Sequence, residues 1–187
     1  MMRVLASCLF VVCCVQSATI SVSPSPYNVE VGQSFTVDVG IDSVADLYAC
    51  QFDLAFDPGL LSASAIAEGA FLGLGGPTFF LAGTIDNVDG LILSTADSLE
   101  GPVSGVTGTG VLASATFTAL APGTTSIEIA NTFLIDSQSD FIYATTGDGT
   151  INVVATPEPV SVGLLLLALA SLAAFGTVSS WTHGGQF

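Results

Sequence analysis

The chain has 187 residues, 50% hydrophobic and 9% charged, and its 16 acidic side chains face a single basic one, Arg3. Nucleic acids and anionic lipid surfaces are poor partners for such a chain, because both need Lys or Arg to neutralise phosphate. The only histidine, His183, lies near the C-terminus, so catalytic triads and zinc clusters built on imidazole are not expected, and the composition indicates a protein that is not an enzyme.

Residues 1–18 have the features of a secretory signal peptide. The charge of Arg3 precedes an apolar run over residues 4–15, and small residues follow at positions 17 and 18, where signal peptidase would cut. Two other interpretations stay open: a buried first helix, and lipidation of Cys8 in a short lipobox-like segment. Cleavage would leave Cys50 as the one remaining cysteine, so no internal disulfide is expected.

The segment that follows, from residue 19 to residue 156, is predicted to fold as an all-β sandwich. It is rich in Val, Ile, Thr and Phe and is interrupted about every eight to twelve residues by Gly, Pro, Asp or Asn. The expected strands are 20–23, 34–41, 47–56, 62–67, 78–85, 91–96, 110–119, 124–130, 141–143 and 150–154.

Alternation within two of these strands predicts which side chains are buried, because neighbouring side chains of a strand point to opposite faces. The side chains expected inside are Phe35, Val37, Val39, Ile41, Cys50, Phe52, Leu54 and Phe56. Cys50 is then a small buried hydrophobe, with a reactive or intermolecular thiol as the alternative.

The same alternation places Asp38, Gln51 and Asp53 on outward faces, where they are candidates for a partner-binding sheet; simple solvation is the alternative. Phe79 and Phe80 follow an irregular Gly-rich loop. One of them is a candidate for an exposed binding side chain, although packing against the core is the more ordinary role.

Two acidic loops are candidates for weak surface calcium association, because Ca²⁺ prefers clustered oxygen ligands. One contains Asp86 and Asp89, and the other contains Asp136 and Asp140. Neither matches an EF-hand loop, so solvated turns are the alternative. No other cofactor is expected.

The order of the predicted strands and turns resembles the cohesin domain of exported bacterial proteins. The resemblance is carried by VEVGQSFTVDV (29–39), LYACQFDLAFDPGLL (47–61), EGAFL (68–72), GVLASATFTA (110–119) and PGTT (122–125). It implies a nine-stranded jelly-roll sandwich and a non-catalytic binding module, contacting a dockerin-type protein or a polysaccharide. The alternative function is an acidic structural component of an extracellular polysaccharide or biofilm matrix, without a discrete ligand.

Residues 160–178 (VSVGLLLLALASLAAFGTV) form an unbroken apolar run that predicts a transmembrane helix; a buried core helix is the alternative. Pro157, Glu158 and Pro159 directly precede it, and this arrangement resembles the PEP-CTERM sorting signal, which a membrane-embedded exosortase removes. The family's terminal arginine cluster is missing here. We therefore expect a signal peptide (1–18), a cohesin-like domain (19–156) and a sorting segment (157–187). The product is expected at the cell surface or outside the cell, anchored transiently or permanently in the membrane by residues 160–178.

Overall fold

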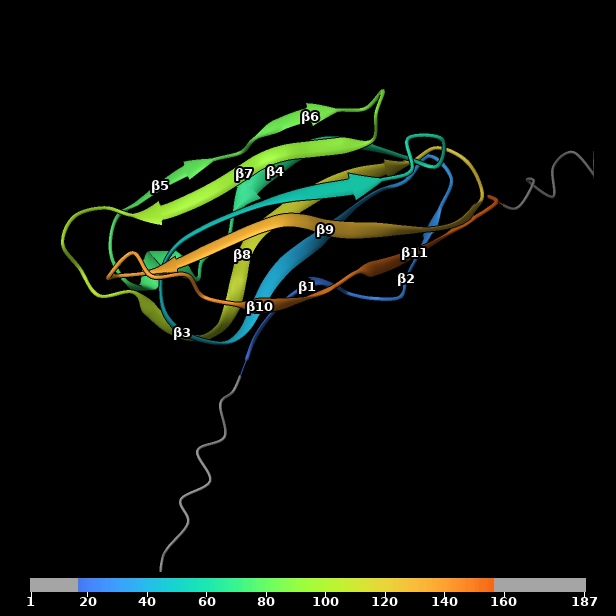
Figure 1. Cartoon of the computed structure of the whole chain (residues 1–187). Helices are drawn as coiled ribbons and strands as arrows, with labels where there is room; N and C mark the ends of the chain where they lie inside the picture. Colours follow the sequence, from blue (N-terminus) through green and yellow to red (C-terminus); the bar gives the residue numbers. More distant parts are fainter. Residues whose placement is uncertain (1–16, 157–187) are drawn as a thin grey trace, which may run out of the picture. The chain divides into compact units, whose positions relative to one another are not determined.

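The computed structural model describes residues 17–156 as an all-β domain of two packed layers (Figure 1). Its strands are β1 (Ala18–Ser23), β2 (Tyr27–Glu30), β3 (Ser34–Phe56), β4 (Leu61–Glu68), β5 (Thr78–Leu81), β6 (Thr84–Asp86), β7 (Leu91–Leu99), β8 (Val106–Ala119), β9 (Gly123–Asp136), β10 (Ala144–Gly147) and β11 (Gly149–Val154). Within the described residues, the one helical element is the short 3-10 turn η1 (Leu72–Leu74). The all-β sandwich is confirmed, but the expected nine strands are wrong, since the described part has eleven.

Strand β3 belongs to both layers because it bends near its middle. Residues 34–41 pair with β1 and β8, whereas residues 49–56 pair with β7 and β9, all antiparallel. Ser43 and Asp46 have positive φ angles of 56° and 55°, and the register with β8 shifts around them. One layer therefore runs β10-β1-β3-β8-β4. The other contains β5, β6, β7, β3 and β9 and continues through β11 to β2.

Several predicted strand boundaries differ from the structure. Segments 34–41 and 47–56 are one bent strand, and segment 78–85 is broken into β5 and β6. The break is at Gly83, where φ is +77° and an added Cβ would lie 2.4 Å from the carbonyl oxygen of Leu93. In segment 141–143, Phe141 makes only an isolated bridge with Ile135. Strand β2 was not predicted, because prolines 24 and 26 precede it.

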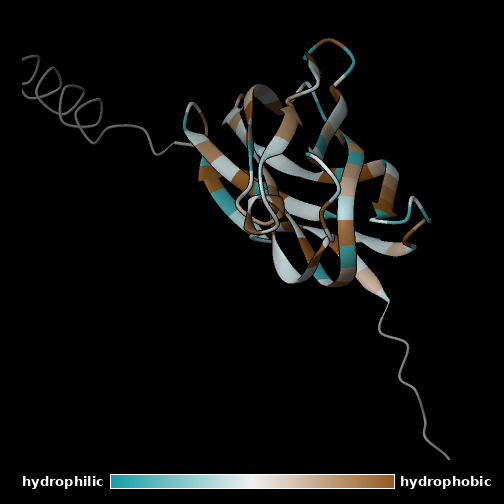
Figure 2. Ribbon diagram, turned by 90° about the vertical axis from the view of Figure 1, so that its left-hand side faces the viewer, coloured by the Kyte–Doolittle hydropathy of each residue, from teal (hydrophilic) through white to brown (hydrophobic). Residues whose placement is uncertain are grey.

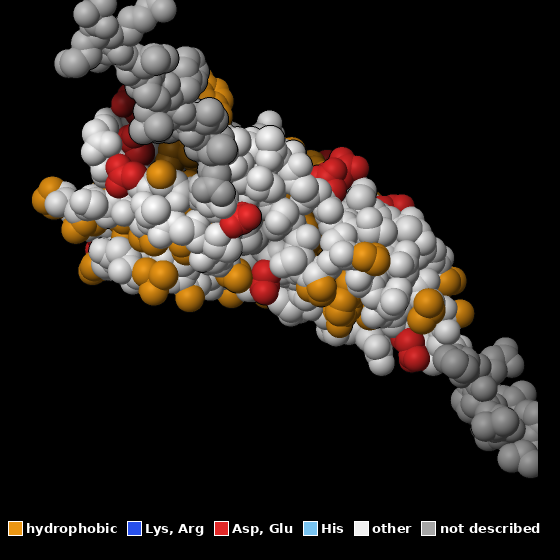
Figure 3. Space-filling model, turned by 90° about the horizontal axis from the view of Figure 1, so that it is seen from below, with side chains coloured by type: hydrophobic (Ala, Val, Ile, Leu, Met, Phe, Trp, Pro, Cys, Tyr) orange, Lys and Arg blue, Asp and Glu red, His pale blue; other side chains and the backbone are white. Residues whose placement is uncertain are grey.

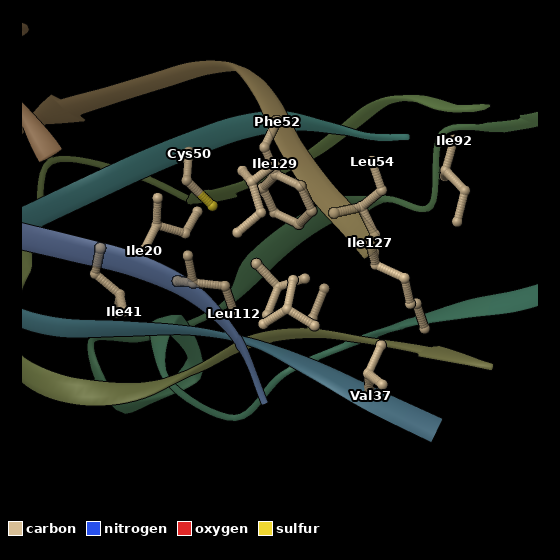
Figure 4. Packing of buried hydrophobic residues seen from close by; sticks show 14 of the residues in the cluster. Ile20, Val37, Ile41, Cys50, Phe52, Leu54, Ile92, Leu112, Ile127 and Ile129 are labelled. Carbon is tan, nitrogen blue, oxygen red and sulfur yellow. The ribbon is translucent and has the colours of Figure 1, made fainter. Parts of the chain in front are cut away.

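The core lies between the layers and follows the predicted alternation. Figure 2 shows apolar and polar residues alternating along the strands, and Figure 4 shows side chains from both layers meeting around Phe52 and Leu112. All eight side chains predicted inside are at most 7% exposed. The ring of Phe117 packs on that of Phe35, its partner in the same layer, at 5.9 Å between centroids, and on that of Phe56 in the other layer at 5.3 Å.

The two predicted targeting segments lie almost entirely outside the described residues. Ala18, the last residue of the predicted signal peptide, is the first residue of β1 and is buried. Residues 17–156 include no helix long and apolar enough to cross a membrane; the predicted helix over 160–178 and the motif at Pro157, Glu158 and Pro159 are outside this range.

Candidate functional site

The outer face of the layer formed by β5, β7, β3 and β9 presents two rows of side chains. Cys50 of β3 points into the core, so its neighbours on either side point outward, together with their cross-strand partners. The first row contains Phe79, Ser98, Ala49 and Ile135, and the second contains Leu81, Ala96, Gln51 and Phe133. The bridge between Ile135 and Phe141 extends the first row by one residue.

These rows form a shallow depression with apolar walls, which we call the outer trough. One wall consists of Phe79 and Leu81, which are 56% and 49% exposed. The opposite wall is Phe133, 45% exposed, whose ring meets that of Phe141, 63% exposed, edge to face at 5.0 Å. The depression has a volume of about 200 Å³, and its floor is made of small residues, including Ala49, Ala96 and Ser98. Large apolar side chains gathered on a surface mark an interaction site.

A second hollow adjoins the outer trough at the break between β5 and β6. It has a volume of about 590 Å³ and shares Leu81 with the trough. Leu93, which is 37% exposed, adds another apolar side chain to its lining. The break is held in place by the Thr95 hydroxyl, which donates to the carbonyl oxygen of Ala82 at 3.3 Å. The apolar surface thus extends along β7 beyond the end of β5.

Asp53 does not lie at the surface as predicted but is only 8% exposed. Its carboxylate accepts a hydrogen bond from the backbone N–H of Ser94 at 2.6 Å and another from Nδ2 of Asn131 at 2.7 Å. Both donors have positive φ angles, 58° and 50°, and the registers of β3 with β7 and with β9 shift beside Asp53. Asp53 therefore connects two β-bulges, one on each side of β3.

The other two polar candidates lie on different layers. Gln51 is exposed and lines the outer trough. Asp38 belongs to the opposite layer, where it is half-buried and accepts a hydrogen bond from Oγ of Ser114 at 2.6 Å. Asp38, Gln51 and Asp53 therefore do not form one surface, and only Gln51 lies among the exposed apolar side chains.

The two adjacent phenylalanines also separate, because neighbouring residues of β5 point to opposite sides. Phe79 is exposed in the outer trough, whereas Phe80 packs against the core. Cys50 is 3% exposed, and burial raises the pKa of its thiol to about 12. The thiol is therefore protonated at neutral pH, as expected for a buried small hydrophobe.

In both candidate calcium loops, an aspartate caps a turn. The Asp86 carboxylate accepts hydrogen bonds from the backbone N–H groups of Val88 and Asp89 at 2.8 and 3.1 Å. The Asp136 carboxylate similarly accepts from Gln138 and Asp140, at 2.9 and 2.8 Å. In the part of the chain that the structure describes, no three His, Cys, Asp or Glu side chains gather as metal ligands would. Calcium association at these loops stays a prediction.

A polar hollow of about 450 Å³, which the sequence did not indicate, lies beside the bend of β3. The Tyr48 hydroxyl, at its edge, donates to the carbonyl oxygen of Gly101 at 2.7 Å. Nearby, the Asp46 carboxylate accepts from Oγ of Ser137 and from the N–H of Gly105, both at 2.7 Å. These bonds, chiefly that from Ser137, lower the pKa of Asp46. These hydrogen bonds connect the bend of β3 to the loop before β8 and to the loop after β9.

Every charged side chain within residues 17–156 is acidic. All acidic residues except Glu158 lie within residues 17–156, and Arg3 and His183 both lie outside this range. Figure 3 shows carboxylates in separate patches on the face seen from below, with no basic side chain beside them among the described residues. A partner that approaches this domain must therefore supply any positive charge.

Leu81, Phe133 and its ring partner Phe141 were not identified from the sequence. Phe133 lies past the predicted end of its strand at residue 130, because Asn131 resembles a turn residue and hides the continuation of β9 to Asp136. Leu81 and Phe141 lie in short apolar segments without clear alternation. The signal that could have found them is a large apolar residue among small residues on the outward-facing positions of a predicted strand.

Comparisons with solved structures identify the fold. A non-cellulosomal cohesin from Archaeoglobus fulgidus aligns with a TM-score of 0.58 and 14% identity, over 76% of this chain and 95% of that one. The third cohesin of ScaC from Acetivibrio cellulolyticus, in complex with the ScaB dockerin, gives 0.60 and 20% over 74% and 99%. A type I cohesin–dockerin complex from Clostridium thermocellum gives 0.60 and 13% over 74% and 100%.

The sequence itself matches no curated protein. It does match a protein-family model, that of the cohesin domain, over residues 20–153. This match covers most of the chain and contains every strand from β2 to β10. The chain belongs to the cohesin domain family.

Proposed function

We propose that this protein is a non-catalytic binding module whose outer trough docks a dockerin-type protein. The proposal rests on three exposed apolar side chains, Phe79, Leu81 and Phe133, around a floor of small residues, with Phe141 packed against Phe133. Aromatic and aliphatic anchors around a shallow depression are typical of the energetic centre of a protein interface.

The solved relatives support the choice of partner. The Acetivibrio cellulolyticus and Clostridium thermocellum cohesins were both solved with bound dockerins. The family membership makes a protein partner the first expectation for this chain, ahead of a polysaccharide. No tryptophan and only three tyrosines lie within residues 17–156, so the aromatic platforms on which sugars stack are scarce.

We further propose that the module works outside the cell. The predicted signal peptide (1–18) would direct export, and the predicted sorting segment (157–187) would hold the domain (19–156) at the membrane until exosortase-type processing. The missing arginine cluster argues for slower or incomplete processing, because positive residues fix the cytoplasmic end of a membrane helix. Intact mass of the cell-surface product would locate both cleavage sites.

Titration of the full chain with dockerin modules by calorimetry tests the docking proposal. We expect binding to the ScaB dockerin of Acetivibrio cellulolyticus or to another dockerin of a panel. Phe79→Asp and Phe133→Asp should each weaken that binding at least tenfold, since each places a charge in a desolvated wall.

Val88→Asp provides the matched control. Val88 is also apolar and is 86% exposed, but it lies in the turn after β6 and does not line the trough. This variant adds the same charge and should bind as the unmodified chain does. Equal losses in all three variants would point to a general effect of added negative charge and would contradict docking in the trough.

A second candidate function is favoured by the unpaired acidity of the domain. An acidic structural component of an extracellular matrix would associate with polysaccharide through bridging divalent cations and would need no discrete trough. In that case the chain should co-sediment with extracellular polysaccharide only in the presence of Ca²⁺. Phe79→Asp should leave that co-sedimentation unchanged, while no dockerin binds.

A further inference from the structure

Asp97, in the middle of β7, is a buried carboxylate without a partner. It pairs in register with Cys50 of β3 and with Phe80 of β5, which both point to the core, so its side chain lies on the core face. It is 3% exposed, and neither carboxylate oxygen has a hydrogen-bond partner among the described residues. A buried charge is costly unless it is paired, and residues 17–156 contain no Lys, Arg or His.

Two titratable groups lie near Asp97: Glu68, from the other layer, and Cys50, its register partner on β3. Glu68, at the end of β4, is acidic, and its Oε1 accepts a hydrogen bond from the hydroxyl of Thr78 on β5. Cys50 is uncharged, because the pKa of its thiol is raised to about 12. Burial, followed by repulsion from Glu68, raises the pKa of Asp97 to about 6. Asp97 is therefore neutral in mild acid and becomes ionised near neutral pH.

Asp97 lies directly beneath the outer trough. The strand segment around it forms part of the trough's floor, while its side chain lies on the other side of the sheet. Strand β5 carries the wall residues Phe79 and Leu81, and its four residues pair only with β7 at the positions around Asp97. Because β5 is a short edge strand, it is the element that an unfavourable charge at Asp97 would displace most easily.

We propose that Asp97 and Glu68 form a proton-dependent latch that controls whether β5, and with it one wall of the outer trough, is closed on β7. With Asp97 protonated, β5 is held and the trough is complete. When Asp97 loses its proton, the buried anion is repelled by the negative charge of Glu68, and β5 opens to give Asp97 access to water. The effect on docking rests on the proposed function, but the opening of β5 does not.

The direction of the pH dependence follows from linkage. Opening returns Asp97 to water, where it ionises at its ordinary, lower pKa of 3.8. The stability of the closed form is therefore fully present below that pKa and is lost as the pH rises through about 6. A displacement of roughly two pH units limits the change in the opening equilibrium to about a hundredfold. Much of that change occurs below pH 5, so about tenfold is expected between pH 5 and pH 7.5.

Hydrogen exchange of the full chain, followed by mass spectrometry between pH 5 and pH 7.5, tests the latch. After correction for the intrinsic pH dependence of exchange, the protection of the β5 amides should fall about tenfold as the pH rises. The amides of β8, which pairs on both sides, should keep their protection. In Asp97→Asn the β5 amides should stay protected at every pH.

Glu68→Gln should move the wild-type transition to lower pH, because it removes the charge that disfavours ionisation of Asp97. This variant also keeps the test decisive if Asp97→Asn does not fold. Asp140→Asn, which changes an exposed carboxylate, should follow the unmodified chain.

Identical pH profiles for β5 in the unmodified chain and in Asp97→Asn would overturn the latch, as would a transition that Glu68→Gln does not move. These experiments use no partner, so they are independent of whether a dockerin binds. A dockerin that binds with the same affinity at pH 5 and pH 7.5 while β5 stays protected would leave the proposed function intact and refute the latch alone.

Discussion

At the scale of single residues, Asp53 shows how one side chain can stabilise an irregular sheet. Its two oxygens accept hydrogen bonds from strands on both sides of β3, at points where each strand bulges. Without that carboxylate, the Ser94 N–H and the Asn131 amide would lose their acceptor in a part-buried position. The bulges lie next to Phe133, in the wall of the outer trough, and next to Leu93, in the adjoining hollow, so Asp53 fixes the backbone beside the candidate site.

Asp53→Ala should lower the free energy of unfolding by about 1 kcal/mol or somewhat more, because it leaves two part-buried donors without their acceptor. Urea denaturation monitored by tyrosine fluorescence would measure this change. Asp89→Ala is the matched control, because Asp89 is exposed and its turn is capped by Asp86; it should change stability by less than about 0.5 kcal/mol. Equal effects of the two substitutions would show that Asp53 stabilises no bulge.

Asp53 also shows which features of the fold could not be predicted from the sequence. Alternation correctly identified the buried faces of β3, including Cys50 and Phe56, because the period of a strand is fixed by its backbone. It failed for Asp53 because a bulge depends on how the neighbouring strands pair, and that pairing is not encoded in the local pattern. Phe133 was missed for the same reason, since the bulge at Asn131 resembles the end of a strand.

At the scale of elements, the free edge of β4 is covered by a side chain. The Asn87 amide accepts a hydrogen bond from the N–H of Ala63 at 2.8 Å and donates another to its carbonyl oxygen at 2.9 Å. This is the pair of bonds that a neighbouring strand would make. It connects the turn after β6 in one layer to β4 in the other, so the side chain also closes the sandwich at this edge.

Asn87→Ala should destabilise the domain by about 1 kcal/mol, because it leaves both backbone groups of the buried Ala63 without these partners. Asn87→Asp keeps the acceptor but replaces the donor with a carboxylate oxygen beside the Ala63 carbonyl oxygen, so it should be at least as unstable as the alanine variant. Guanidinium denaturation midpoints would rank the three proteins. A stability for Asn87→Ala equal to that of the unmodified chain would mean that water replaces the amide without loss.

Element boundaries were predictable where turn residues and alternation agree, and not where glycine changes the pairing. Segment 78–85 was expected to be one strand because Thr, Phe, Leu and Ile predominate in it. Gly83 breaks it, since its positive φ and its close approach to the Leu93 carbonyl require a residue without Cβ. The hollow beside the outer trough exists because of this break, so this part of the candidate site was not visible in the sequence.

At the scale of the whole molecule, the charge distribution is the dominant feature. The formal net charge is −15, and no described basic side chain offsets the carboxylates. The hydrogen bonds of Asp42, Asp46 and Asp53 satisfy individual oxygens but do not neutralise the charge. The folded domain therefore holds like charges closer together than the unfolded chain does, which opposes folding.

Added salt should consequently raise the Tm, because screening weakens a repulsion that is strongest in the compact state. Raising NaCl from about 0.02 M to 0.5 M shortens the screening length to a few ångströms, and a gain of about 1 kcal/mol corresponds to a rise of about 3–5 °C for a domain of this size. Thermal scans of the full chain by circular dichroism would measure it.

A comparison of CaCl₂ with MgCl₂ at equal ionic strength separates screening of charge from binding of calcium at the loops of Asp86 and Asp136. Screening alone predicts equal rises in Tm with the two salts. A larger rise with calcium would reveal a specific site, and a Tm indifferent to all three salts would show that the carboxylates are too dispersed to oppose folding.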